Sequence, residues 1–77
     1  MEKIIVGILT DLRPEFDFTT QVDFIGEGML DSFDIVNLVT ALDERFAISI
    51  DGMDILPENF SSVNAIAALL LKNGVKP

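Results

Sequence analysis

Residues 30–39, Leu-Asp-Ser-Phe-Asp-Ile-Val-Asn-Leu-Val, decide how the rest of the chain is interpreted. They place Ser32 where apolar residues begin to recur at helical spacing, and this pattern predicts a helix over residues 32–46. Asp31 is a favourable N-cap, and Asp34 stands three residues later, as in a capping box. The expected core stripe of this helix is Ile35, Leu38, Val39, Leu42 and Phe46. A second line, Phe33, Val36 and Thr40, is predicted to be more exposed.

Two more helices are predicted, one on each side of residues 32–46. The first covers residues 2–13 and ends at Pro14, because a proline disfavours helical geometry in the residue before it. The last begins at Ser61 or Ser62, either of which can cap it. Its expected core face is Val63, Ile66, Ala67, Leu70 and Leu71. Between the second and last helices, Asp51 is expected to start one or two helical turns before Pro57.

Residues 14–30 have no sustained helical period, and a connection of this length is uncommon in a compact domain. Its bulky apolar side chains predict that it packs across the helices and closes one end of them: Phe16, Phe18, Val22, Phe24 and Ile25. The sequence therefore predicts an all-α fold, a small four-helix bundle of three main helices and one short helix with a long loop after the first. We expect residues 1–77 to form one domain and the protein to be a monomer.

The formal charge of −8 is concentrated in the middle of the chain. Residues 14–71 hold eleven acids and a single base, Arg45. This distribution argues against nucleic acid and anionic membrane surfaces as partners, because both require a basic footprint. It favours partner proteins with basic patches. No apolar run is long enough for a signal peptide or a membrane span, so we expect a soluble, cytoplasmic protein without membrane insertion.

The chain has no cysteine and no histidine. This removes the commonest general base and the usual zinc ligand sets, so neither catalysis nor a metal site is predicted. Ser32 then has two interpretations. It is either a helix-start serine that bonds the backbone, or the site of a phosphoester at a helix N-terminus, where N–H groups and the helix dipole favour an anion.

Together, several features of the sequence resemble the family of acyl carrier and peptidyl carrier proteins. They are the stretch from Leu30 to Asp34, the apolar residues Leu38, Val39, Leu42 and Phe46, the leading helix, the loop that contains Gly28, the acids Asp43 and Glu44, and residues 60–63. The resemblance implies that Ser32 receives 4'-phosphopantetheine from coenzyme A through a phosphopantetheinyl transferase. Acyl groups would then be carried as thioesters on the thiol of that arm and delivered to partner enzymes.

The resemblance also implies a docking face for basic patches on those enzymes: Asp31, Phe33, Asp34, Val36, Thr40, Asp43 and Glu44. The expected pathway is fatty-acid or related lipid or secondary-metabolite biosynthesis. Asn37 and Arg45 stand where fatty-acid carriers are often acidic, and residues 54–60 resemble discrete carriers served by stand-alone adenylating ligases. A discrete aminoacyl or peptidyl carrier is therefore the alternative. A third possibility, from another class, is an acidic adaptor that binds a basic partner through helix 32–46 without any modification.

Overall fold

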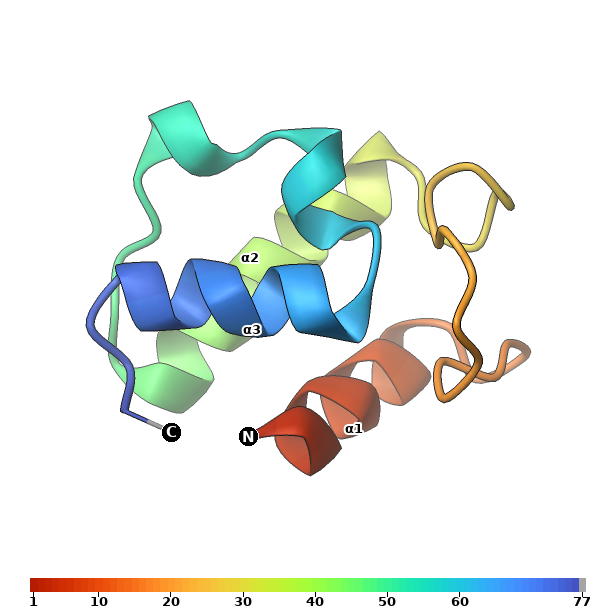
Figure 1. Ribbon diagram of the computed structural model, residues 1–77, viewed down its shortest axis with the longest axis horizontal. Helices are drawn as coiled ribbons and strands as arrows, with labels where there is room; N and C mark the ends of the chain where they lie inside the picture. Colours follow the sequence, from red (N-terminus) through yellow and green to blue (C-terminus); the bar gives the residue numbers. More distant parts are fainter. Residues whose placement is uncertain (77) are drawn as a thin grey trace.

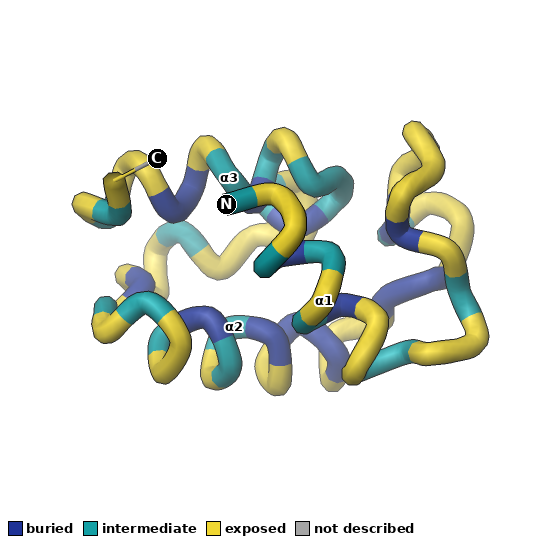
Figure 2. The backbone as a smooth tube through the Cα atoms, turned by 90° about the horizontal axis from the view of Figure 1, so that it is seen from below, coloured by how far each residue is buried: buried dark blue, intermediate teal, exposed yellow. Residues whose placement is uncertain are grey.

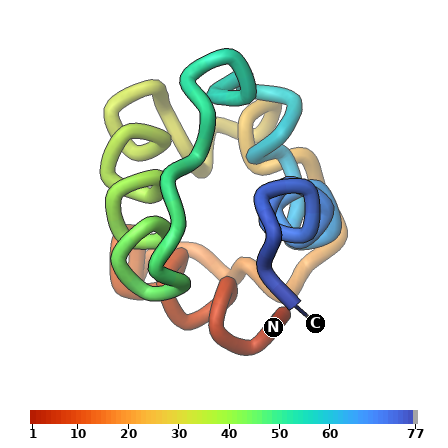
Figure 3. Tube along the Cα trace, turned by 90° about the vertical axis from the view of Figure 1, so that its left-hand side faces the viewer, coloured from red at the N-terminus to blue at the C-terminus, as the bar shows by residue number. Residues whose placement is uncertain are grey.

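The computed structural model describes residues 1–76. Three α-helices, α1 (Glu2–Leu12), α2 (Ser32–Phe46) and α3 (Val63–Lys72), surround a shared interior (Figures 1 and 3). No strand occurs in the described residues, so the predicted all-α class is confirmed. The expected single short helix is instead two 3₁₀ turns, η1 (Gly52–Asp54) and η2 (Pro57–Phe60). The second was missed because proline was taken as a stop, although it also favours the first position of a helix.

The core is built from one stripe on each long helix, as Figure 2 shows for α2, whose inward side is buried. Six residues of these three helices have no exposed surface: Ile5 and Leu9 from α1, Leu38 and Leu42 from α2, and Ile66 and Leu70 from α3. On α3 the predicted face is rotated. Leu69 is 4% exposed and Leu71 is 47% exposed, so the prediction for Leu71 is wrong. Both residues fit an apolar stripe, and packing against the other helices decides between them.

The long loop packs against the helices as predicted, with Val22 as an exception on the surface. The buried rings of Phe18 and Phe24 meet edge to face, with their centroids 5.1 Å apart. The backbone of Phe24 links the middle of the loop to the segments that precede α3 and α2. Its N–H donates to the Ser61 carbonyl, and its carbonyl accepts from the N–H groups of Met29 and Leu30. The chain is therefore fixed just before α2 begins.

The helix caps are local and follow the sequence. Asp31 caps α2 through the predicted capping box, and Ser62 caps α3 by accepting from the Ala65 N–H. The end of α2 was not predicted in detail: Ala47 adopts the left-handed conformation with φ 54°, and its N–H donates to the Asp43 carbonyl. Lys72, in the last turn of α3, forms an ion pair with Asp54 at 2.7 Å and so ties η1 to α3.

Candidate functional site

Ser32 is the first residue of α2, and it is exposed. The capping of this helix is performed by its two neighbours instead. Asp31 Oδ1 accepts from the Asp34 N–H at 2.9 Å, and Asp34 Oδ2 accepts from the Asp31 N–H at 3.0 Å. Of the two interpretations of Ser32, the structure therefore does not show the first, a serine that bonds the backbone at a helix start. Its hydroxyl stays available beside the free N–H groups of the first helical turn.

Among residues 1–76, the structure records no hydrogen bond for the side-chain hydroxyls of Ser32 and Ser49. The other two serines are engaged: Ser61 donates to the Glu58 carbonyl, and Ser62 caps α3. All four threonine hydroxyls donate to an oxygen of the chain. Ser49 is exposed but lies in a segment without regular secondary structure rather than at a helix start. Ser32 is thus singled out as an unused hydroxyl at a helix N-terminus.

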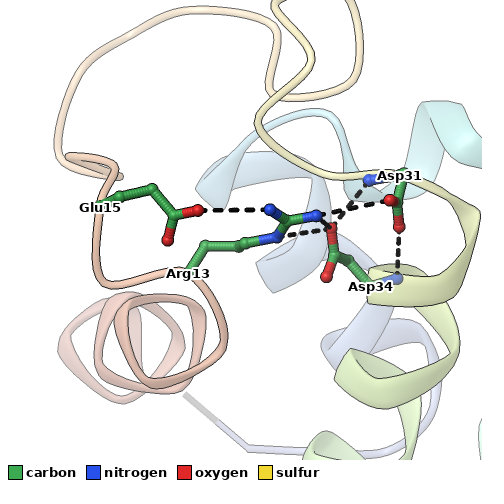
Figure 4. Close-up of polar contacts among 4 residues, drawn as sticks. All are labelled: Arg13, Glu15, Asp31 and Asp34. Carbon is green, nitrogen blue, oxygen red and sulfur yellow. Dashed lines mark hydrogen bonds and ion pairs between the residues drawn. The ribbon is translucent and has the colours of Figure 1, made fainter.

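Arg13 lies against the capping box (Figure 4). Its Nε and Nη2 are 2.9 and 2.8 Å from Asp34 Oδ2, and Nη2 is 3.4 Å from Asp31 Oδ2. Nη1 is 3.3 Å from a carboxylate oxygen of Glu15. The guanidinium holds the pKa of the Asp34 carboxyl below its ordinary value, because it donates hydrogen bonds to the ionised form. The same contacts raise the pKa of Arg13 above its ordinary value.

The structure divides the residues expected to form the docking face into two groups. Five of them are exposed and will be called the α2 outer face: Asp31, Phe33, Val36, Thr40 and Glu44. The phenyl group of Phe33 is the most exposed apolar side chain on α2, at 72%, followed by Val36 at 60%. Two large apolar groups in water beside carboxylates form a surface suited to a partner with an apolar patch and basic residues around it.

The remaining two aspartates do not lie on that face as expected. Asp34 is 6% exposed, and its carboxylate is held by Arg13 and the Asp31 N–H. Asp43 is half-buried, and its carboxylate accepts from the Ile50 N–H, which fixes the segment after α2. Asp34 is therefore removed from the predicted docking face, and Asp43 has a structural bond to keep. Both carboxylates accept bonds that hold the fold, and the donors Arg13 and the Ile50 N–H are brought to them by the folded chain rather than by helical spacing.

Sequence reasoning also missed the role of Arg13. It is separated from Asp31 and Asp34 by 18 and 21 residues, so no local pattern joins them. The only available signal is that Arg13 is a base at the end of the first helix, just before the acidic part of the chain begins. That position is compatible with pairing but does not name the partner.

Three other possibilities are a metal site, a membrane-spanning helix and a groove beside Ser32. No group of three possible metal ligands occurs in residues 1–76, and within them no helix has the length and apolarity needed to span a membrane. An open groove of about 730 Å³ lies between the start of α1, residues 18–23 and residues 61–64. None of the residues that line it belongs to α2, so it is separate from the surroundings of Ser32.

Residues 3–70 match the family described as "Phosphopantetheine attachment site". The chain is also similar to "Aminoacyl carrier protein 1" of Bradyrhizobium diazoefficiens, with 33% identity over 69 residues, which cover 90% of this chain and 76% of that relative. No solved structure matches the chain. Because the family match covers most of its length, the chain belongs to the phosphopantetheine attachment family and is a carrier protein.

The family implies a covalently attached 4'-phosphopantetheine group, and the residues present fit it. Attachment needs a hydroxyl that a separate enzyme can reach, and the exposed, unbonded hydroxyl of Ser32 meets this requirement. The bound group supplies a thiol for thioester formation, which a chain without cysteine cannot supply itself. The capping box holds the backbone on both sides of the Ser32 hydroxyl at the start of α2.

Proposed function

We propose that Ser32 is the residue to which 4'-phosphopantetheine is attached. The observation that supports this is the division of labour at the start of α2. Asp31 and Asp34 satisfy the helix terminus between them, and the serine between them is left exposed with no hydrogen bond within residues 1–76. A serine kept only as a cap would accept from the backbone, as Ser62 does at α3.

The loaded protein carries acyl intermediates as thioesters to partner enzymes, in fatty-acid or related lipid or secondary-metabolite biosynthesis. The alternative is a discrete aminoacyl or peptidyl carrier, and one specific observation supports it, the similarity to an aminoacyl carrier protein. The chain itself has no catalytic role in this proposal, because it offers neither histidine nor cysteine and activation of the cargo belongs to a separate ligase. The unmodified-adaptor alternative is disfavoured by the family to which the chain belongs.

The partners proposed are a phosphopantetheinyl transferase, an acyl- or aminoacyl-activating ligase and acyl-processing enzymes, all in the cytoplasm. They would meet the α2 outer face through basic patches. This fits the surface, on which Asp31 and Glu44 are exposed next to the apolar groups of Phe33 and Val36. Charged groups at the rim would steer the encounter, and the apolar groups would bury area once contact is made.

Intact-mass measurement tests the attachment site. The apo protein is incubated with coenzyme A and a broad-specificity phosphopantetheinyl transferase, and the expected result is a gain of one phosphopantetheinyl group. Ser32→Ala should gain none, whereas Ser49→Ala, which removes the other exposed and unbonded hydroxyl, should gain one as the wild type does. If well-folded wild type stays unmodified with several transferases, or if Ser32→Ala is still modified, the proposed site is wrong.

A second measurement separates the two cargoes. The loaded protein is trapped from cells that express it naturally, and the group on the thiol is weighed after release. The mass of a fatty acid or of another carboxylic acid without an amino group supports the main proposal. The mass of an amino acid supports the alternative. A protein recovered with the arm but reactive with neither class of ligase would contradict both.

A further inference from the structure

Arg13 connects the end of α1 to the start of α2 at the position of Ser32. Its guanidinium contacts both aspartates that flank the serine, at 2.8 Å for Asp34 and 3.4 Å for Asp31 (Figure 4). The only other carboxylate it contacts in residues 1–76 is that of Glu15, at 3.3 Å. Neither the fold nor the family match accounts for this arrangement, because helix capping itself requires only the two aspartates.

Most of the contacts between Arg13 and the capping box involve one oxygen of Asp34. Asp34 Oδ2 accepts from the Asp31 N–H at 3.0 Å and also contacts Nε and Nη2 of Arg13. The Asp34 side chain is 9% exposed and that of Arg13 is 31% exposed. Without the guanidinium, a nearly buried carboxylate would be left with one backbone donor. It would then gain a proton or turn toward water, and either change would weaken the bond that fixes the backbone before Ser32.

Arg13 also controls the charge around the serine. Two carboxylates within two residues of Ser32 oppose the addition of an anionic phosphodiester to its oxygen. The guanidinium offsets this repulsion, since it lies against both carboxylates. The helix terminus can then act on the phosphate with its free N–H groups.

We propose that Arg13 is a positioning residue for the attachment of the prosthetic group, an inference that rests on the proposed role of Ser32. In the attachment step, Ser32 Oγ attacks the phosphorus of coenzyme A that bears pantetheine. The bond between that phosphorus and the bridging oxygen breaks, and adenosine 3',5'-bisphosphate leaves with that oxygen. A general base of the transferase takes the hydroxyl proton. Arg13 touches none of the reacting atoms; it holds the backbone and the charge of the aspartates on both sides of them.

The test compares two variants that each remove one positive charge, Arg13→Gln and Arg45→Gln. Arg45 lies in the last turn of α2, where its guanidinium sits 5.7 Å from the ring centre of Phe46. It forms no ion pair in the described part of the chain, so Arg45→Gln is a control for the loss of one positive charge at the other end of α2. Steady-state kcat and KM for the transferase are measured with each apo protein as substrate. All measurements are made at a temperature where circular dichroism shows every variant to be fully folded.

Arg13→Gln is expected to lower kcat about tenfold, because a shifted nucleophile reacts more slowly even when it is bound. Its KM should not rise, since the freed aspartates make the site more attractive to a basic enzyme. Arg45→Gln should keep kcat within twofold of wild type. If kcat of Arg13→Gln is also within twofold, or if only KM changes, Arg13 does not position the serine.

A double variant checks the mechanism itself. In Arg13→Gln/Asp34→Asn, an amide replaces the carboxylate, so its oxygen can accept from the Asp31 N–H without a countercharge. The double variant is expected to recover most of the lost kcat and to restore slow hydrogen exchange at the Asp31 amide, which should be faster in Arg13→Gln. Failure of both recoveries would overturn the inference. Failure of the proposed Ser32 site looks different, because then either wild type and all variants stay unmodified or Ser32→Ala is still modified.

Discussion

The buried side of α2 can be tested by replacing Leu42 with alanine. Leu42 has no exposed surface and packs in the shared core of the three helices. A fully buried Leu→Ala change removes apolar contacts and leaves a cavity, which costs about 3 kcal/mol within a range of about 2–5. A chain of 77 residues has a total stability of about 4–12 kcal/mol, so the loss is a large fraction of it.

Urea titration followed by circular dichroism at the helical band is the suitable assay, since the chain contains neither tryptophan nor tyrosine as a fluorescent reporter. With an m-value of about 1 kcal/mol per M for so small a domain, the midpoint should fall by about 3 M. Val36→Ala is the matched control on the opposite side of the helix, where the side chain is 60% exposed. It should change the stability by less than about 0.5 kcal/mol.

A cost of less than about 1 kcal/mol for Leu42→Ala would contradict full burial of this side chain, because such a loss is typical of partly exposed sites. Similar losses of unfolding free energy in the two variants would contradict the structure as well, since the two faces of α2 would then not differ in burial. A change in the m-value would point to an altered denatured state or an intermediate rather than to a simple loss of packing.

Two further predictions concern the site. Asp34→Asn should be less stable than wild type near neutral pH, and the difference should shrink below about pH 4. A carboxyl whose pKa is lowered by folding stabilises the protein above its unfolded pKa, and this contribution is lost as the pH falls through the folded pKa. Urea midpoints at about pH 7 and about pH 3 measure this difference, and a difference independent of pH would refute the prediction. Phe33→Ser should leave the free energy of unfolding within about 0.5 kcal/mol of wild type, since Phe33 is 72% exposed. It should raise the KM of the transferase several-fold. An unchanged KM for both the transferase and the activating ligase would remove Phe33 from the docking face.

Most of the fold follows from local pattern. The start of α2 at Ser32 and its capping box were predicted, and the cap of α3 was narrowed to Ser61 or Ser62, of which the structure uses Ser62, because each feature depends on residues three or four positions apart. The packing of the long loop was predicted from its bulky apolar content. A short helical turn after Asp51 was predicted and is η1, whereas η2 and the left-handed end of α2 at Ala47 were not predicted, because short elements have weak sequence signals and their geometry is set by what they pack against.

The candidate site was predicted only in part. The exposed position of Ser32 at the start of a helix and the exposure of Phe33 and Val36 agree with the structure, whereas the attachment role of Ser32 stays a prediction. The error concerned Asp34, which the resemblance to carrier proteins placed on the docking face by its position in the helix. The structure buries it against Arg13 instead. A salt bridge over 21 residues leaves no trace in the spacing of either residue, so it could not be inferred.

The sequence by itself determined the helices, the position of Ser32 at a helix start and the acidic character of its surroundings, since these depend on short-range hydrogen bonds, periodicity and charge. Only the tertiary structure decided which groups remain free. It selected Leu69 over Leu71 for the core, gave Asp43 to the Ile50 N–H, and brought Arg13 from the end of α1 to Asp34. The physical reason is that burial and ion pairing depend on which elements meet in space, whereas helical spacing specifies only the elements themselves.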